Sequence, residues 1–368
     1  MAEGSATTPD RVTRTRQIME RLDIDLLLIG PSSDFFYLTG RHIMPTERLV
    51  ALVVPARGRG TIVVPAIAAP LLEDLRPATE VLKVAETDDP VARLASVAHE
   101  HGARTVAVND DLWSGFLLDL QRALPAAIFS RASAVLSEVR CIKDAAELTA
   151  LRGAARRIDA VWEEFCATAT LTGQTELAVQ RALRGLIQSH GLEFSWCHVG
   201  AGPNSASPLH EGTDRTIQTG DPVLIDYGGT CAGYFGDTCH TPVAGRPHPE
   251  FVRVYEIVRE AQQAAFESAQ VGSSCEDVDR AARAVIAAQG YGDLFVHRVG
   301  HGIGLSAHED PYLIAGNRRP LDSGMVFSAE PGIYMPGRWG LRIEDIIGIE
   351  SGVTRRYNNV AHDLRRLP

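Results

Sequence analysis

Short apolar runs alternate with amphipathic segments of helical length through the first 140 residues. Runs rich in Leu, Ile and Val predict strands, and apolar residues spaced three and four apart predict helices. The predicted strands are 23–29, 49–54, 61–64 and 105–109, and the predicted helices are 9–22, 90–100 and 112–124. This alternation indicates a small α/β domain. Because its titratable residues are scattered, we expect it to flank a functional site rather than to carry one.

The pattern changes near residue 140. Apolar residues from Leu148 to Val161 recur every three or four positions and predict a long helix, which begins after a plausible cap at Asp144. A domain boundary just before this helix gives domains of residues 1–140 and 141–368.

The second domain repeats one order of elements. Helices are predicted at 144–169 and 176–190 and strands through 225 and over 234–243, followed by helices at 249–269 and 275–289 and strands at 325–334 and 341–350. Two helices followed by strands, twice over, predict an α+β domain with an internal duplication.

Composition narrows the class of protein. With 45% hydrophobic and 22% charged residues among 368, the chain can bury a large core, which excludes disordered, collagen-like and disulfide-scaffold classes. A net charge of −10 argues against nucleic acid as a partner, and the six cysteines form no CxxC pair. The polar N-terminus and the short apolar runs predict neither a signal peptide nor a membrane span. We therefore expect a cytoplasmic protein with a small-molecule or peptide partner.

Acidic residues placed in apolar strands are the most informative feature. Asp226 closes the run Pro222–Ile225, and Asp237 follows a glycine-rich stretch, 228–233. If these glycines form a hairpin turn, Asp226 and Asp237 become cross-strand neighbours. Two carboxylates so close repel each other unless a cation lies between them.

A second acidic pair follows the same logic. Glu330 and Glu344 lie on either side of a predicted turn, 335–338, which is about midway between them. Any one of these acids alone could be an ordinary strand-end residue. Burying four carboxylates without counter-charge costs too much free energy, however, so we predict two divalent cations.

Histidines extend the set of candidate ligands. His301 lies between Gly300 and Gly302, which would let the backbone approach a ligand closely, and His308 follows in a second loop. Four carboxylates and one imidazole suit manganese, iron or cobalt and tolerate zinc.

These residues resemble the metallopeptidase family with the pita-bread fold, which contains methionine aminopeptidase, aminopeptidase P, prolidase and creatinase. The motifs that carry the resemblance are 225–228 (IDYG), 236–238 (GDT), 297–311 (HRVGHGIGLSAHEDP), 328–334 (SAEPGIY) and 340–345 (GLRIED). Residues 36–40 (FYLTG) resemble the creatinase-type N-terminal domain. The resemblance implies that residues 1–140 form a creatinase-type N-terminal domain. It also implies that residues 141–368 form a pita-bread catalytic domain with a pseudo-twofold duplication.

The resemblance also implies roles for individual residues and an assembly. Asp226 would bind one metal ion, Asp237 and Glu344 would bridge both, and His301 and Glu330 would complete the other site. Glu330 would also act as general base and then as general acid. His308 would stabilise the tetrahedral intermediate, and His210 would contact the substrate near the scissile bond. Arg342, or alternatively Arg298, would bind the substrate carboxylate. Two divalent ions, with manganese favoured, and a homodimer are expected.

Two positions depart from the family pattern. Cys239 and His240 stand where relatives usually carry Thr or Ser and then Arg. We hypothesise an altered metal preference or a specialised substrate as the consequence, because residues around the ligands orient them and tune metal affinity.

The resemblance favours hydrolysis of Xaa-Pro bonds, either in dipeptides or in short peptides. Such bonds need a dedicated enzyme because proline lacks an N–H and fixes φ. Two alternatives are a metal-dependent enzyme for a small non-peptide substrate and a binding protein that has lost activity.

Overall fold

The computed structural model describes residues 8–75 and 79–368, and the polar segment 1–7 on which the signal-peptide expectation rests lies outside these residues. The chain divides into two compact units between Arg140 and Cys141.

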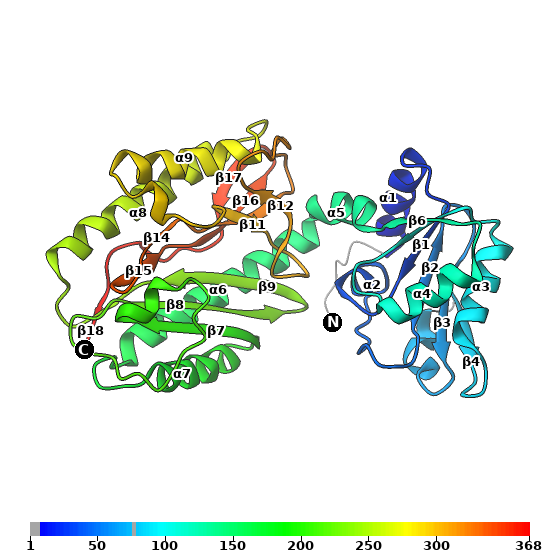
Figure 1. The fold of residues 1–368 in the computed structure, drawn as a ribbon, viewed down its shortest axis with the longest axis horizontal. Coiled ribbons are helices and arrows are strands. Elements are labelled where there is room, and N and C mark those ends of the chain that lie inside the picture. The colour runs from blue at the N-terminus through cyan, green and yellow to red at the C-terminus, as the bar shows by residue number, and fades with distance from the viewer. Residues whose placement is uncertain (1–7, 76–78) are drawn as a thin grey trace. The chain divides into compact units, whose positions relative to one another are not determined.

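A six-stranded mixed sheet forms the centre of the N-terminal unit, in the order β4-β3-β2-β1-β5-β6 (Figure 1). Its strands are β1 (Leu26–Ile29), β2 (Ala51–Pro55), β3 (Gly60–Pro65), β4 (Thr79–Val84), β5 (Thr105–Val108) and β6 (Ile128–Arg131). Its helices are α1 (Thr8–Arg21), α2 (Ser33–Thr39), η1 (Ala69–Leu75), α3 (Pro90–Glu100), α4 (Ser114–Ala123) and α5 (Ser133–Cys141), which ends at the boundary.

The predicted strands and helices of this unit are all present, but five further elements, β4, β6, α2, α5 and η1, were missed. Strand β1 is buried along its whole length, and apolar strands of this kind are recognised easily from the sequence. Strand β6 is mostly exposed, β4 mixes polar with apolar residues, and α2 and α5 are short. Exposed strands carry little hydrophobic signal, and short helices show too few turns for a helical period to be recognised.

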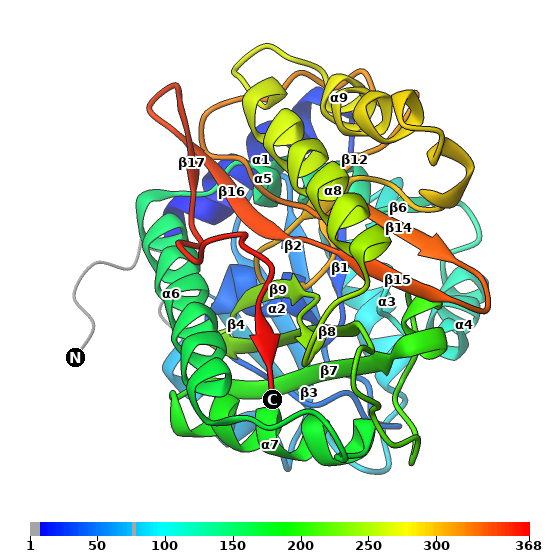
Figure 2. The same ribbon diagram turned by 90° about the vertical axis from the view of Figure 1, so that its left-hand side faces the viewer.

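Two helix pairs and their sheets build the second unit (Figure 2). Its helices are α6 (Ala145–Thr168), α7 (Glu176–Ser189), η2 (Gly202–Ala206), α8 (Pro249–Ser268), α9 (Cys275–Ala288) and η3 (Gly292–Leu294). Its strands are β7 (Glu193–Ala201), β8 (Val223–Cys231), β9 (Tyr234–His240), β10 (Val243–Ala244), β11 (Gly300–Gly302), β12 (Glu309–Leu313), β13 (Val326–Ala329), β14 (Gly332–Met335), β15 (Trp339–Arg342), β16 (Asp345–Glu350), β17 (Val353–Arg356) and β18 (Arg366–Leu367).

Each helix pair packs against its own sheet. Helices α6 and α7 share a buried core with β7-β8-β9, and α8 and α9 share one with the sheet β12-β11-β13-β16-β17 and the hairpin β14-β15. Helix α6 begins where predicted, because the Asp144 carboxylate accepts hydrogen bonds from the backbone N–H of Ala146 and Glu147 in a capping box. The predicted order of two helices followed by strands therefore occurs twice.

Each of the last two predicted strands is broken in two. The segment 325–334 forms β13 and β14, and 341–350 forms β15 and β16. The break leaves Glu330 and Glu344 between strands, which is where the candidate ligands lie.

Candidate metal centre

The hairpin of β8 and β9 positions the first two acids. Its turn consists of Ala232 and Gly233, both with positive φ, as a two-residue hairpin turn requires. Asp226 consequently lies opposite Cys239, and Asp237 opposite Gly228. The predicted direct pairing of Asp226 with Asp237 is wrong by two positions, because Gly228 and Gly229 belong to the strand rather than to the turn. The two acids still share one face of the sheet as diagonal neighbours.

Glu330 and Glu344 lie in a gap between two β-ladders, β13–β16 and β14–β15, that follow the same pairing register. Ala329 pairs with Asp345 on one side of the gap, and Gly332 pairs with Arg342 on the other. This register places Glu330 opposite Glu344, as expected from the turn. The backbone N–H of Glu344 donates to the carbonyl of Cys239 at 3.2 Å, which joins this pair to the first hairpin.

His301 lies in β11 between two glycines that no larger residue could replace. A Cβ at Gly300 would lie 1.9 Å from the carbonyl oxygen of Ser328, and one at Gly302 would lie 2.2 Å from that of Asp310. The His301 Nδ1 lies 3.1 Å from the carbonyl oxygen of Gly302, which leaves Nε2 for the site. The ligand atoms of Asp237, His301 and Glu344 all lie within 4.8 Å of one another.

Burial and mutual repulsion disfavour the ionised forms of Asp237 and Glu344. Burial, followed by the charge of Asp226, raises the pKa of Asp237 well above its usual range. Burial and the charge of Asp237 do the same to the pKa of Glu344. Within the described part of the chain, no group donates a hydrogen bond to the buried Glu344 Oε1. A cluster of buried acids with an unpartnered oxygen fits a bound cation, which would supply the missing positive charge.

Glu330 shows the opposite behaviour. Burial acts to raise its pKa, but the hydrogen bond from His301 and the positive charges of His301 and Arg342 hold it below its usual range. The His301 Nε2 lies 3.2 Å from Glu330 Oε1, and the Arg342 Nε lies 3.6 Å from Oε2. Glu330 is therefore an ionised carboxylate beside the cluster, suited to accept a proton.

Asp226 is the most accessible of the four acids, although its side chain is only 14% exposed. The indole N–H of Trp196 donates to its Oδ1 at 2.8 Å, and the guanidinium of Arg342 contacts Oδ2. Arg342 also donates to the hydroxyl of Tyr334, which in turn lies 2.9 Å from His297 Nε2. Trp196 and Tyr334 were not among the predicted residues, because only the strand register reveals that they reach the site.

The two predicted substrate histidines lie in different surroundings. The ring of His308 lies 3.9 Å from that of His301 between centroids. Surrounding protein, and then His301, lowers the pKa of His308 to about 4, although part of its ring is exposed. His210 lies 2.8 Å from the buried carboxylate of Glu176. Among the described residues, its hydrogen bonds and ion pairs do not reach the acidic cluster.

The two unusual residues point to opposite faces of the sheet. Cys239 lies opposite Asp226 and shares its face, where it is fully buried. His240 faces α6 instead, where its ring stacks on Trp162 with 4.1 Å between centroids. Only Cys239 can therefore affect the candidate ligands directly.

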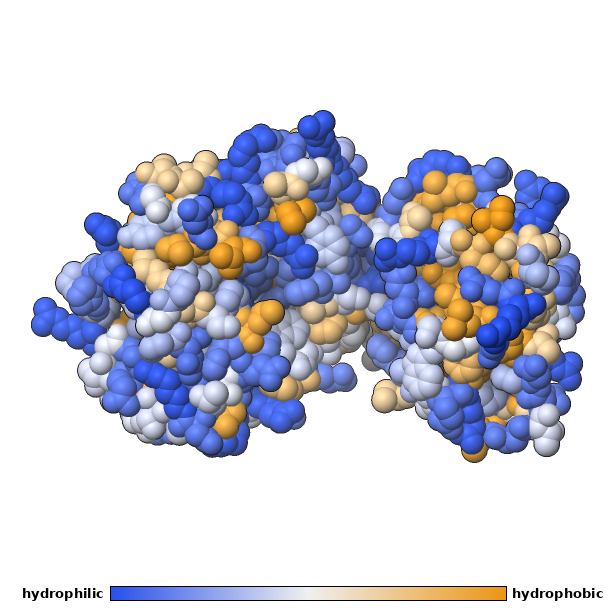
Figure 3. All heavy atoms as spheres, viewed as in Figure 1, coloured by the Kyte–Doolittle hydropathy of each residue, from blue (hydrophilic) through white to orange (hydrophobic). Residues whose placement is uncertain are grey.

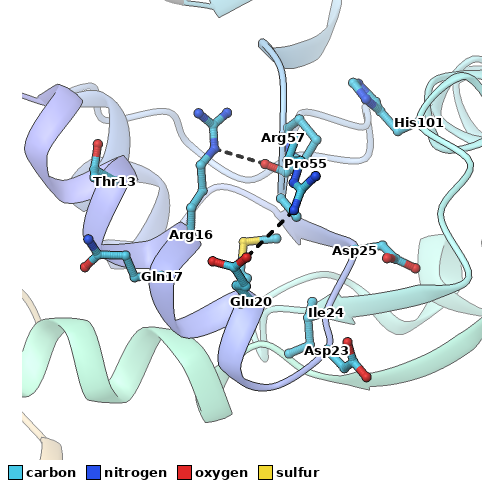
Figure 4. Close-up of a pocket in the computed structure, with 12 residues that line it drawn as sticks. Thr13, Arg16, Gln17, Glu20, Asp23, Ile24, Asp25, Pro55, Arg57 and His101 are labelled. Atoms are coloured by element: carbon cyan, nitrogen blue, oxygen red, sulfur yellow. Dashed lines mark hydrogen bonds and ion pairs between the residues drawn. The ribbon is translucent and has the colours of Figure 1, made fainter.

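The N-terminal unit contains a separate hollow whose polar side chains do not form a comparable cluster. A hollow of about 710 Å³ in the N-terminal unit is lined by side chains of mixed charge (Figure 4). Its Arg16 donates to the carbonyl of Pro55, and Arg57 pairs with Glu20. These groups bind one another rather than converging on one point. Among the described residues, no helix has the length and apolar character needed to cross a membrane.

Comparison with known proteins identifies the family of the chain. Residues 149–351 match the model of metallopeptidase family M24, and residues 11–142 match that of the creatinase/prolidase N-terminal domain. A probable dipeptidase of Mycobacterium tuberculosis, PepE, is 39% identical over 93% of this chain and 92% of its own length. An Xaa-Pro dipeptidase of Lactobacillus helveticus is 32% identical over 96% of this chain and 98% of its own length.

A solved structure extends the agreement to the fold. The recombinant prolidase from Thermococcus sibiricus superimposes with a TM-score of 0.94 and 34% identity, over 99% of this chain and all of that one. The chain therefore belongs to metallopeptidase family M24, with a pita-bread catalytic domain that follows a creatinase/prolidase N-terminal domain.

Proposed function

We propose that this metallopeptidase hydrolyses Xaa-Pro dipeptides at a centre formed by Asp226, Asp237, His301, Glu330 and Glu344. The observation that carries the proposal is a cluster of two buried carboxylates, Asp237 and Glu344, with the imidazole of His301. The carboxylates of Glu330 and Asp226 lie close by, and these like charges need cations. The names of the two relatives, dipeptidase and Xaa-Pro dipeptidase, support the substrate class.

The ligand set favours two divalent ions, and its oxygen-rich character favours manganese. Asp226, Asp237, His301, Glu330 and Glu344 would hold these ions. Divalent ions held there would polarise the scissile carbonyl and lower the pKa of water. The protein side chains perform the remaining steps.

We assign proton transfer to Glu330. Its carboxylate is ionised and lies beside His301 at the cluster, so it can accept a proton from water and then return it to the leaving proline nitrogen. His308 has a pKa of about 4 and is neutral near pH 7, so it can donate an N–H to the carbonyl oxygen as charge develops there. His210, held by Glu176, is assigned to substrate contact.

The free C-terminal carboxylate of a dipeptide substrate also needs a positively charged side chain as its partner. Arg342 is buried against Asp226, Glu330 and Tyr334, whereas Arg298 is half-buried and stacks on the ring of Tyr312 at 4.3 Å. Both stay candidates for the carboxylate. Arg298→Met is expected to raise KM for dipeptides more than kcat falls if Arg298 is the contact.

A release assay tests the proposed reaction. Protein stripped with a chelator and reloaded with Mn²⁺, Co²⁺ or Zn²⁺ receives Xaa-Pro dipeptides and Xaa-Pro-Yaa tripeptides, beside a Glu330→Ala control. We expect metal-dependent cleavage of dipeptides and a loss of at least about 100-fold in the control. Cleavage of tripeptides would reassign the enzyme as an aminopeptidase, and cleavage of neither set would contradict the proposed substrate class.

We also propose a cytoplasmic homodimer. Exposed apolar side chains of the N-terminal unit support association, because soluble monomers seldom expose many such residues together. They include Ile67, Leu71, Trp113, Leu118 and Ile128, and Figure 3 shows apolar side chains gathered on one face of this unit. Light scattering coupled to size-exclusion chromatography is expected to give twice the chain mass of 39.8 kDa.

A further inference from the structure

We propose that Trp196 is a positioning residue whose indole N–H fixes the orientation of the Asp226 carboxylate toward the metal centre. This inference rests on the proposed function, because Asp226 is a metal ligand only there. The hydrogen bond from Trp196 Nε1 to Asp226 Oδ1 is 2.8 Å long, and its acceptor is an ionisable carboxylate. Such charge-assisted bonds are stronger than neutral ones and fix geometry.

A bulge in β7 turns Trp196 toward the site. Phe194 pairs with Gly229 and Trp196 pairs with Gly228, so Ser195 is one extra residue in the ladder. Without this extra residue, Phe194 and Trp196 would face the same side of the sheet. With it, Phe194 packs against the core beneath α6 and α7, and Trp196 shares the face of Asp226.

Gly228 makes room for the indole. A Cβ at this position would lie 2.1 Å from Trp196 Cη2 and 2.3 Å from Cζ2, far inside contact distance. The six-membered part of the indole therefore lies across the strand two residues after Asp226, which brings Nε1 to the carboxylate. Phe235 on β9 stacks on the same indole with 5.9 Å between centroids.

The two oxygens of Asp226 thus have different partners. Trp196 holds Oδ1 and Arg342 holds Oδ2, so the carboxylate plane is fixed by donors from two separate strands. Residues that hold metal ligands in this way commonly change metal affinity by 10- to 100-fold when they are replaced.

Calorimetric titration with Mn²⁺ of chelator-stripped protein tests this role. Trp196→Phe keeps an aromatic ring over Gly228 but removes the N–H. We expect the variant to bind at least one equivalent of Mn²⁺ about 10- to 100-fold more weakly than the wild type, with unchanged thermal unfolding of the metal-free form. Trp113→Phe, on the N-terminal unit, is the matched control and is expected to titrate like the wild type.

A second variant disturbs the hydrogen bond between Trp196 and Asp226 by displacing the indole instead of removing its N–H. Gly228→Ala keeps the indole N–H but forces the ring away, so it is also expected to weaken Mn²⁺ binding. Unchanged Mn²⁺ affinity in Trp196→Phe would overturn the positioning role while leaving the proposed metal centre intact. Absence of Mn²⁺ binding by the wild type would instead contradict the proposed centre, and the role of Trp196 with it.

Discussion

At the scale of single residues, burial decides which groups carry charge. His240 is 8% exposed, its ring stacks on Trp162, and its Nε2 lies 3.2 Å from the hydroxyl of Thr238. Burial lowers the pKa of His240 to about 3. Between about pH 3 and pH 6.5 the folded protein therefore keeps this ring neutral, whereas the unfolded chain, with an ordinary histidine pKa near 6.5, would protonate it.

This difference predicts acid sensitivity. Below pH 6.5 the unfolded state binds a proton at His240, whereas the folded state does not. The stability that neutral His240 contributes is therefore lost as pH falls from 6.5 toward 3. Between pH 7.5 and 5 the loss should reach about 2 kcal/mol. His240→Phe, which keeps the stack on Trp162, should lose less stability over this range in urea unfolding. His99→Phe, at an exposed position, should follow the wild type, and a parallel loss in all three proteins would contradict the assignment.

The two departures from the family pattern separate at this scale as well. In the sequence, Cys239 and His240 form one unusual pair beside the candidate ligand Asp237. Alternation along β9 sends them to opposite faces, so Cys239→Ser probes the face of Asp226 alone. His240→Arg would place a charge against the ring of Trp162, and the double variant would therefore combine a site effect with a loss of stability.

At the scale of elements, glycines set how closely strands and helices approach. Helix α6 crosses β9 at Gly236, where a Cβ would lie 2.7 Å from Ile158 Cγ1 and 3.0 Å from the backbone of Ala154. Gly153, in the same helix, has open space around its Cβ position.

Alanine at these two glycines should have opposite effects. Gly236→Ala should destabilise the fold by about 1–3 kcal/mol, because the helix or the strand must move. Gly153→Ala should stabilise it by about 0.5–1 kcal/mol, because alanine restricts the unfolded chain and favours helix. Urea unfolding of both variants measures the difference, and equal effects of one sign would show that α6 does not pack against β9 as described.

Elements also show where prediction from sequence succeeds and fails. The long helices and buried strands follow from hydrophobic spacing, and the opposition of Glu330 and Glu344 follows from a symmetric turn. The first hairpin was misjudged because four glycines lie near its turn, and only packing shows that Gly228 accommodates Trp196. The bulge at Ser195 leaves no mark in the sequence, since it is defined by the partner strand.

At the scale of the whole molecule, every candidate ligand belongs to the unit that begins at Cys141. The candidate ligands come from β8, β9, β11 and the gap between the ladders β13–β16 and β14–β15. The negative charges of the candidate carboxylates repel one another when the fold brings them together. The acidic cluster is therefore expected to reduce stability without metal and to increase it with metal.

Unfolding of the wild type and Glu344→Gln, with and without Mn²⁺, tests whether the acidic cluster holds metal. At 100 times its Kd, Mn²⁺ should stabilise the wild type by about 2.7 kcal/mol. Without metal, Glu344→Gln should be at least as stable as the wild type, because it removes a repelled charge, and Mn²⁺ should stabilise it much less. Asp279→Asn, which removes a buried carboxylate paired with Arg283, should keep the full response to Mn²⁺. Equal stabilisation of the wild type and Glu344→Gln, or no stabilisation of the wild type, would contradict the account.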